Sequence, residues 1–183
     1  YTDFGVAMDV VGNGKAGMML FGAGYGANTN IQGSAYVRVL HPEKNPSAPI
    51  PGMAYGYPRL YNVFGGSYEG KVEGNTNIYF NPGKYGYVTG AIYGGGCNGY
   101  VGGKTYLELA GGYIDEAYGG ARNANVGGGT HVWAYDGKAR GIAGANHLII
   151  CNLYGGNDIA GSISGTMPAR FTEAKWNASP TGP

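Results

Sequence analysis

The sequence has little charge and no long hydrophobic run. Charged residues make up 13% of its 183 residues, about half the usual fraction, and the net charge is +1. Because basic and acidic residues are scattered, electrostatics gives no reason to expect nucleic acid or an anionic membrane as a partner. No apolar run approaches the ~18 residues of a membrane-spanning helix, so we expect no transmembrane segment.

The sequence also lacks the motifs of common catalytic and metal sites. It has three histidines and no Gly-x-Ser-x-Gly, Cys-x-x-Cys or His-Glu-x-x-His motif. The glycine runs at 94–96 and 127–129 lack the lysine and the helix that follow a phosphate-binding loop. Asp115 and Glu116 are an adjacent acidic pair, which supplies too few ligands for a calcium ion by itself. We therefore expect no cofactor and no metal ion.

Glycine and tyrosine are present in excess, with 38 and 17 residues. No strict period of three residues occurs, which excludes collagen. A hydrophobic content of 43% excludes a disordered glycine linker, and the length suits one domain with a sizeable core. The composition favours an extracellular protein. Because the chain begins at Tyr1, without an initiator methionine or a signal peptide, we interpret it as a processed or excised piece of something longer.

A glycine-rich pattern repeats along the chain. Each copy has an apolar residue, an aromatic residue and a glycine in succession. The clearest copy is Ile92–Leu109, and the others are Leu20–Val39, Val63–Phe80, Ala117–Ala134 and a truncated Leu153–Thr166. Their aromatic residues are Phe21, Phe64, Tyr93, Tyr118 and Tyr154, at spacings of 25 to 43 residues. Such spacings are typical of solenoids and arrays.

The second half of each copy predicts a β-strand with one buried face. In the clearest copy the alternate residues are Val101, Gly103, Thr105, Leu107 and Leu109, and the other copies have similar residues at the same positions. A slip of one residue would expose every apolar side chain, so equivalent strands are expected to stack in register. The outward rows then bring Tyr36, Asn77, Tyr106 and His131 to one level, and Arg38, Tyr79, Glu108 and Trp133 to the next.

These patterns predict an all-β fold, a parallel β-helix (solenoid) of about five irregular coils. We expect an N-terminal coil or cap over residues 1–19, repeats over 20–166 and a C-terminal cap or linker over 167–183. Five of the nine prolines lie in 41–62, which is therefore predicted to be a Pro-rich insertion loop. Antiparallel up-and-down strands are the competing arrangement, but they do not place the same side chains at the same phase.

The pattern aromatic-Gly-Gly, then Val-x-Gly-x-Thr-x-apolar, resembles the glycine-rich β-helix repeats of large bacterial surface proteins, including adhesin-like and autotransporter-passenger-like families. The resemblance covers most of Leu20–Thr166. It implies a right-handed parallel β-helix, export to the bacterial cell surface, and adhesion or structural display. It brings no catalytic motif to this chain.

The two cysteines fall at different phases of the repeat. Cys97 lies four residues after Tyr93, whereas Cys151 lies three residues before Tyr154. We therefore expect two free, buried thiols. A disulfide between them is the alternative, and it would support secretion.

The outward-facing aromatic residues are the candidate binding face. Flat rings with polar neighbours suit the faces of sugars or another protein. The candidate residues are Tyr36, Tyr79, Tyr106, Glu108, His131, Trp133 and Tyr135. The alternatives are that these rings only stabilise neighbouring strands, or that the insertion covers them.

The sequence thus favours a non-catalytic extracellular module, adhesive or structural, that presents this face to a glycan or protein partner. One alternative is a structural subunit that stacks on other copies of itself or on neighbouring domains of a longer chain, as in a surface fibre. Another is a carbohydrate-active enzyme on a β-helix scaffold. Glycoside hydrolysis needs a pair of carboxylates, and the outward rows offer only Glu108 in phase.

Overall fold

In a computed structural model, the chain forms an all-β fold of parallel strands. The structure describes residues 6–11, 17–40, 58–83, 86–138, 140–141 and 147–165, with ten strands and no helix among them. Sheet A contains β1 (Val6–Val11), β3 (Ala35–Leu40), β5 (Thr76–Asn81), β7 (Thr105–Leu109) and β9 (Thr130–Ala134). Sheet B contains β2 (Met18–Phe21), β4 (Arg59–Phe64), β6 (Tyr87–Tyr93), β8 (Gly112–Tyr118) and β10 (Leu148–Tyr154). The predicted all-β class and parallel pairing are confirmed.

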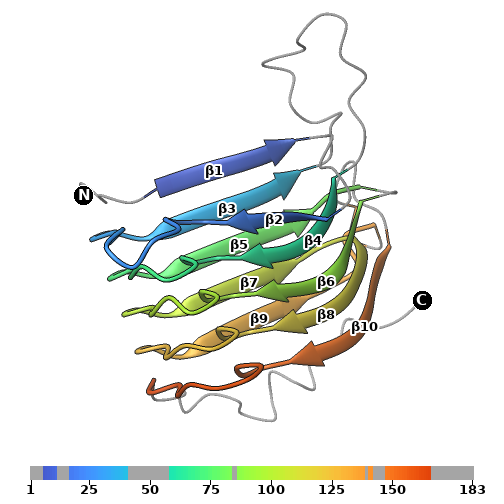
Figure 1. The fold of residues 1–183 in the computed structure, drawn as a ribbon. Helices are drawn as coiled ribbons and strands as arrows, with labels where there is room; N and C mark the ends of the chain where they lie inside the picture. Colours follow the sequence, from blue (N-terminus) through green and yellow to red (C-terminus); the bar gives the residue numbers. More distant parts are fainter. Residues whose placement is uncertain are drawn as a thin grey trace, which may run out of the picture.

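The chain alternates between the two sheets. A strand of sheet B leads through a glycine-rich turn into a strand of sheet A, and the next connection returns to sheet B (Figure 1). Sheet A therefore holds the odd-numbered strands in sequence order, and sheet B holds the even-numbered ones. Each sheet pairs strands from successive copies of the repeat, as the sequence pattern predicts.

The register of the copies is the predicted one. In sheet B, Phe21 lies opposite Phe64, and the same level continues through Tyr93, Tyr118 and Tyr154. In sheet A, successive strands place equivalent residues side by side: Tyr36, Asn77, Tyr106 and His131 at one level, and Arg38, Tyr79, Glu108 and Trp133 at the next. Aligning the copies on their aromatic residue was therefore enough to specify the pairing of strands far apart in sequence.

The predicted strands of sheet A are longer than the observed ones. Val72 and Val101 form isolated parallel bridges, and a bend separates each of them from the strand that follows. Glycine stands in this bend because the copies approach closely there: a Cβ built on Gly103 would lie 2.6 Å from the carbonyl oxygen of Gly74. The bend turns the chain into the direction of sheet A.

The core lies between the two sheets. Sheet A contributes Val37, Val39, Ile78, Phe80, Leu107 and Leu109, and sheet B contributes Leu20, Leu60, Val63, Val88, Ile92, Ile114 and Ala117, all of them buried. The apolar residue that precedes each repeat aromatic belongs to this core, except in the last copy. Leu153 of β10 is 46% exposed because no described strand packs beyond it.

Buried threonines tie each copy to the next. Thr76 donates a hydrogen bond to the carbonyl oxygen of Gly94 at 2.6 Å, and Thr105 donates to that of Gly119 at 2.5 Å. Both side chains are fully buried, so each hydroxyl satisfies a carbonyl group that water cannot reach. This explains why threonine recurs in an otherwise apolar row.

Two sequence-based expectations need correction, and several lie outside the described residues. Arg59–Asn62, expected within the 41–62 insertion, forms the first part of β4, while residues 41–57 are not described. Both cysteines are free, as expected, and Cys97 is buried, but Cys151 is exposed because it lies on β10, at the end of sheet B. Of the predicted caps (1–19 and 167–183), residues 1–5, 12–16 and 167–183 also lie outside the described part.

Candidate functional site

The predicted binding face lies on the outer surface of sheet A. Its residues come from four successive strands, and Tyr135 directly follows the last of them. The side chains that alternate with them on β3, β5 and β7 are buried, and Val132 of β9 packs partly buried against the core, so this set points away from the core. The structure thus brings together the seven residues that the sequence grouped, which we call the aromatic face.

Three rings of the aromatic face form one stack. Tyr106 stacks on His131 with ring centroids 4.9 Å apart, and Trp133 lies 5.9 Å from both rings. Trp133 is 50% exposed and Tyr36 is 40% exposed. Trp133 stands on β9, the edge strand of sheet A, so the described chain contains no further strand on its far side. An indole ring in this position can receive the flat apolar face of another ring.

Tyr135 and Glu108 form a braced polar corner beside this stack. The Tyr135 hydroxyl donates a hydrogen bond to Oε1 of Glu108, and the guanidinium of Arg140 lies 4.4 Å from the centre of the Tyr135 ring. Burial, together with the hydrogen bond to Glu108, raises the pKa of Tyr135 well above its ordinary value. The phenol therefore stays protonated and holds Glu108 in place, which leaves the second carboxylate oxygen available as an acceptor.

A second candidate site lies over the outer surface of sheet B, where sequence reasoning did not place one. Its base is the row of repeat aromatics Phe21, Phe64, Tyr93, Tyr118 and Tyr154, which we call the aromatic ladder. Neighbouring rings stack with centroids 4.7 to 5.1 Å apart and planes within 14° of parallel. Phe64 is fully buried and Tyr118 is 7% exposed, although both point away from the core between the sheets.

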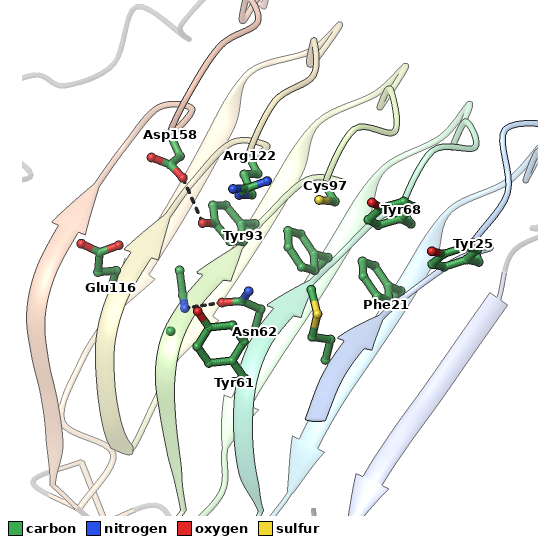
Figure 2. A pocket seen from close by; sticks show the side chains of 14 residues that line it. Phe21, Tyr25, Tyr61, Asn62, Tyr68, Tyr93, Cys97, Glu116, Arg122 and Asp158 are labelled. Atoms are coloured by element: carbon green, nitrogen blue, oxygen red, sulfur yellow. Dashed lines mark hydrogen bonds between the residues drawn. The ribbon is translucent and has the colours of Figure 1, made fainter. Parts of the chain in front are cut away.

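The turn that follows each sheet B strand carries the residues beside the ladder. Four residues after the aromatic, successive copies have Tyr25, Tyr68, Cys97, Arg122 and Asp158. On the other side lie residues of the strands themselves, among them Met19, Tyr61, Asn62 and Glu116. Between these two rows runs a groove of about 560 Å³, and Phe21, Phe64 and Tyr93 of the ladder contribute to its lining (Figure 2). This volume falls within the range of small-ligand sites.

The groove changes character along its length. The end near β2 is aromatic and apolar, with Met19, Phe21, Tyr25, Tyr61 and Tyr68. The end near β8 and β10 carries the charged residues Glu116, Arg122 and Asp158 (Figure 2). This gradient exists because the turn position four residues after the aromatic has no fixed residue type, whereas the ladder position does.

Tyrosine hydroxyls hold the two carboxylates of the charged end. Tyr93 donates to Oδ2 of Asp158 at 3.0 Å, and Tyr118 donates to Oε2 of Glu116 at 3.2 Å. Burial and the neighbouring carboxylates raise the pKa of Tyr93 strongly and that of Tyr118 to about 12. Both phenols are thus neutral donors at physiological pH, and the charges of this end come from the carboxylates and Arg122.

Arg122 reaches back over the middle of the groove. Burial lowers the pKa of Arg122, but the interactions of its guanidinium with Cys97, Tyr93 and Asp158 outweigh burial and raise the pKa overall. Cys97 is 3% exposed, so its sulfur forms part of the groove lining and not of the open surface. This end thus carries one positive charge, from Arg122, and two negative charges, from Glu116 and Asp158.

Neither the remaining histidines nor the acidic residues form a further cluster in the described part of the chain. His147 pairs with Asp136 at 2.6 Å, and His41 lies outside the described residues. Among the described residues, no group of three or more His, Cys, Asp or Glu side chains is placed to hold a metal ion. Within the same ranges, no helix is long and apolar enough to cross a membrane.

The residues of the groove carried a weaker signal in the sequence than those of the aromatic face. Aligning the copies on the ladder aromatics also aligns the groove residues four positions later. The side chains at that position differ in chemistry from copy to copy, so the sequence pattern does not mark them as a site. Comparisons with protein-family models, curated proteins and solved structures gave no match to this chain. Function is therefore inferred from the geometry of the two surfaces.

Proposed function

We propose that this chain is a non-catalytic module of a bacterial cell surface that binds a glycan through the aromatic face. Its scaffold is a right-handed parallel β-helix of about five coils. The observation that carries the proposal is the stack of Tyr106, His131 and Trp133, whose last ring is half exposed at the edge of sheet A. The alternation of strands between two parallel sheets, in register from copy to copy, supports the β-helix.

The chemistry of the face suits a neutral sugar. The indole of Trp133 offers an apolar plane, and amphipathic aromatic residues are enriched at binding surfaces because one part is apolar while the other forms hydrogen bonds. Glu108 and His131 add polar groups beside the stack, and the Tyr135 hydroxyl fixes the Glu108 carboxylate. This combination can stack on one face of a pyranose ring and bond the hydroxyls at its rim.

A non-catalytic role fits the distribution of carboxylates. Glu108 is the carboxylate at the outward positions of β3, β5, β7 and β9. Asp9 of β1 lies at the same level three strands away, about 14 Å, which is too far for the acidic pair that hydrolysis requires. In the groove, Glu116 and Asp158 each accept a hydrogen bond from a tyrosine hydroxyl of the ladder. We interpret those carboxylates as binding and bracing groups.

Replacing Trp133 by alanine is expected to weaken glycan binding about 30-fold, since a central aromatic residue contributes about 2 kcal/mol to an interface. Affinity electrophoresis against soluble glucans, galactans, mannans and xylans would identify a bound polysaccharide and measure the loss. Tyr106→Ala should reduce binding as well, because it removes the ring behind Trp133. Tyr113→Ala, a 40% exposed tyrosine of sheet B, is the matched control and should bind like the wild type.

The proposal would be wrong if the wild-type chain bound none of these polysaccharides, or if Trp133→Ala and Tyr106→Ala bound them unchanged. Equal losses in Trp133→Ala and Tyr113→Ala would also contradict it, because they would show that the aromatic face has no special role.

A specific observation also favours the second candidate function, a subunit that stacks end to end. Sheet A begins with β1, before any strand of sheet B, and sheet B ends with β10, after the last described strand of sheet A (Figure 1). A second copy placed beyond β10 would pair its β1 with β9 and its β2 with β10. The strands left unpaired at one end can therefore pair with the strands left unpaired at the other end of another copy. Such a contact joins copies head to tail.

The exposed residues of the last copy fit this candidate. Ile149, Leu153, Tyr154 and Ile159 are 45 to 59% exposed, whereas the residues equivalent to Leu153 and Tyr154 in the middle copies are buried. An unpaired strand edge with apolar side chains promotes association.

Leu153→Lys is expected to prevent such association, because it places a charge where another copy would pack. Sedimentation velocity over a hundred-fold concentration range measures it: the wild type should form larger species as the concentration rises, and the variant should not. Thr89→Lys, at an exposed position of β6 and two strands away from β10, controls for added charge and should associate like the wild type. A wild-type chain that is monomeric throughout the range would refute the stacking candidate.

A further inference from the structure

The groove over sheet B differs from the aromatic face in what its rings offer to a ligand. Inside the ladder each ring covers the faces of its neighbours, with centroids 4.7 to 5.1 Å apart. Phe64 is fully buried and Tyr93 is 4% exposed, so the half-buried Phe21 is the ring among these three that presents an edge to the groove. Ring edges are the positive part of the aromatic quadrupole, and they attract the face of another aromatic ring. The floor of the groove is therefore better suited to an aryl group than to a sugar ring.

The protein itself shows this mode of packing. Tyr68 meets Phe21 edge to face, at a centroid distance of 5.7 Å and an angle of 88°. Tyr25 then stacks on Tyr68 at 4.6 Å and is 68% exposed, while Met19 and Tyr61 are 42% and 47% exposed. The apolar end of the groove thus leaves room for one further aromatic side chain among exposed aromatic and thioether groups.

The opposite end has complementary charge for a cation. Glu116 and Asp158 carry two negative charges against the single positive charge of Arg122. Tyr93 and Tyr118 orient one oxygen of each carboxylate, so the remaining oxygens are acceptors held in fixed places. The net charge of this end is negative, and an ammonium or guanidinium group would balance it.

The distance between the two ends of the groove sets the spacing expected between the aromatic group and the cationic group of a ligand. Tyr25 and Arg122 belong to the first and fourth copies, which are three strand spacings, or about 14 Å, apart. In an extended peptide, side chains four residues apart lie on the same side and are separated by about 13 Å. An extended peptide lying along the stacking direction would match both ends of the groove at once.

From this match we propose that the groove binds an extended peptide segment of a protein partner, with an aromatic side chain at the Tyr25 end and a basic side chain four residues away at the Glu116–Asp158 end. The site is separate from the aromatic face and does not depend on the glycan proposal. Gly90 and Ala91 lie on the strand side of the groove, where the Ala91 amide donates a hydrogen bond to Oδ1 of Asn62.

The test uses a capped synthetic peptide, Gly-Trp-Ser-Gly-Ser-Lys-Gly, and its reversed sequence, titrated into the whole isotopically labelled chain. At least one of the two should shift the backbone amide signals of Gly90, Cys97 and Arg122, while those of Tyr106 and Trp133 stay in place. Replacing the peptide's tryptophan by alanine, or its lysine by glutamate, should weaken binding about five-fold or more, as expected for losing an aromatic contact or a charge pair.

Variants of the protein separate the two ends. The double variant E116Q/D158N keeps the size of both side chains and should weaken binding of the lysine peptide about five-fold or more, with a smaller dependence on salt than the wild type. Asp158→Lys should bind the glutamate peptide better than the lysine peptide. Tyr25→Ala should reduce binding of both, and Trp133→Ala, on the other sheet, should change neither.

The proposal is overturned if neither peptide shifts the groove signals, if the shifts map to the aromatic face, or if the charge variants bind both peptides equally. A polysaccharide that shifts the groove signals in place of the peptides would also overturn it. Because Trp133→Ala alters only the aromatic face, a failure here leaves the glycan proposal standing, and the reverse also holds.

Discussion

Gly94→Ala is expected to destabilise the fold by at least about 3 kcal/mol, the upper end of the range for overpacking. A Cβ built on Gly94 would lie 2.2 Å from the carbonyl oxygen of Gly119 in the next copy. The obstacle is backbone, which cannot rotate away like a side chain, and Gly119 is itself held because its carbonyl oxygen accepts the hydroxyl of buried Thr105. Relieving the clash therefore requires two hydrogen-bonded strands to separate.

The chain contains its own control for this prediction. Gly155 occupies the same position in the last copy, directly after Tyr154, and a Cβ built there meets nothing within 4 Å. Gly155→Ala should change the free energy of unfolding by no more than about 0.5 kcal/mol, as for an ordinary surface substitution. Urea denaturation followed by circular dichroism compares the two variants. If both were equally stable, the close approach of the middle copies would be wrong.

This comparison also shows why the register could be obtained from the sequence. In the first four copies the glycine after the aromatic is required by the copy that packs against it, so its recurrence reports the stacking itself. The same holds for Thr76 and Thr105, whose hydroxyls donate to carbonyl groups of the following copy. Residues that satisfy contacts between copies recur at a fixed phase, and that phase is visible in one chain without any relatives.

The bend within each copy left no such trace. Val72, Gly74 and Thr76 continue the alternation of inward positions, so the pattern predicts one continuous strand where the structure has a bridge, a bend and β5. Alternation records which side chains are buried, and a bend that keeps the same residues facing inward does not disturb it. The sequence therefore predicted the inward rows correctly and the strand ends incorrectly.

The groove was missed for a related reason. The ladder aromatics were read as markers of the repeat, and their neighbours four residues later differ in every pair except Tyr25 and Tyr68. A surface that varies from copy to copy has no period, and periodicity was the only available signal. The aromatic face was easier to predict because the alternation of buried residues in β3, β5, β7 and β9 identifies its outward positions directly.

Phe64→Ala is expected to destabilise the fold by about 3 to 5 kcal/mol, the usual cost of removing a buried phenylalanine. Phe64 is fully buried and stacks between Phe21 and Tyr93, at 4.9 and 4.7 Å. Tyr154→Ala removes a ring at the same ladder position, but this ring is 45% exposed and stacks on Tyr118 as its ladder neighbour. Its cost should be about 1 kcal/mol, near the worth of one aromatic pair.

Phe64→Leu separates the contribution of this ring to stability from its contribution to peptide binding. Leucine keeps the site filled, so denaturant unfolding should show a loss of no more than about 2 kcal/mol, which combines a core exchange with the loss of the stacked pairs. The groove, however, would lose the ring on which Phe21 stacks, and peptide binding should fall while glycan binding at Trp133 stays unchanged. A Phe64→Leu variant with full peptide affinity would show that the ladder supports the groove only by filling space. If Phe64→Ala and Tyr154→Ala destabilised the fold equally, the middle of the ladder would be no more tightly packed than its exposed end, and the expectation would be wrong.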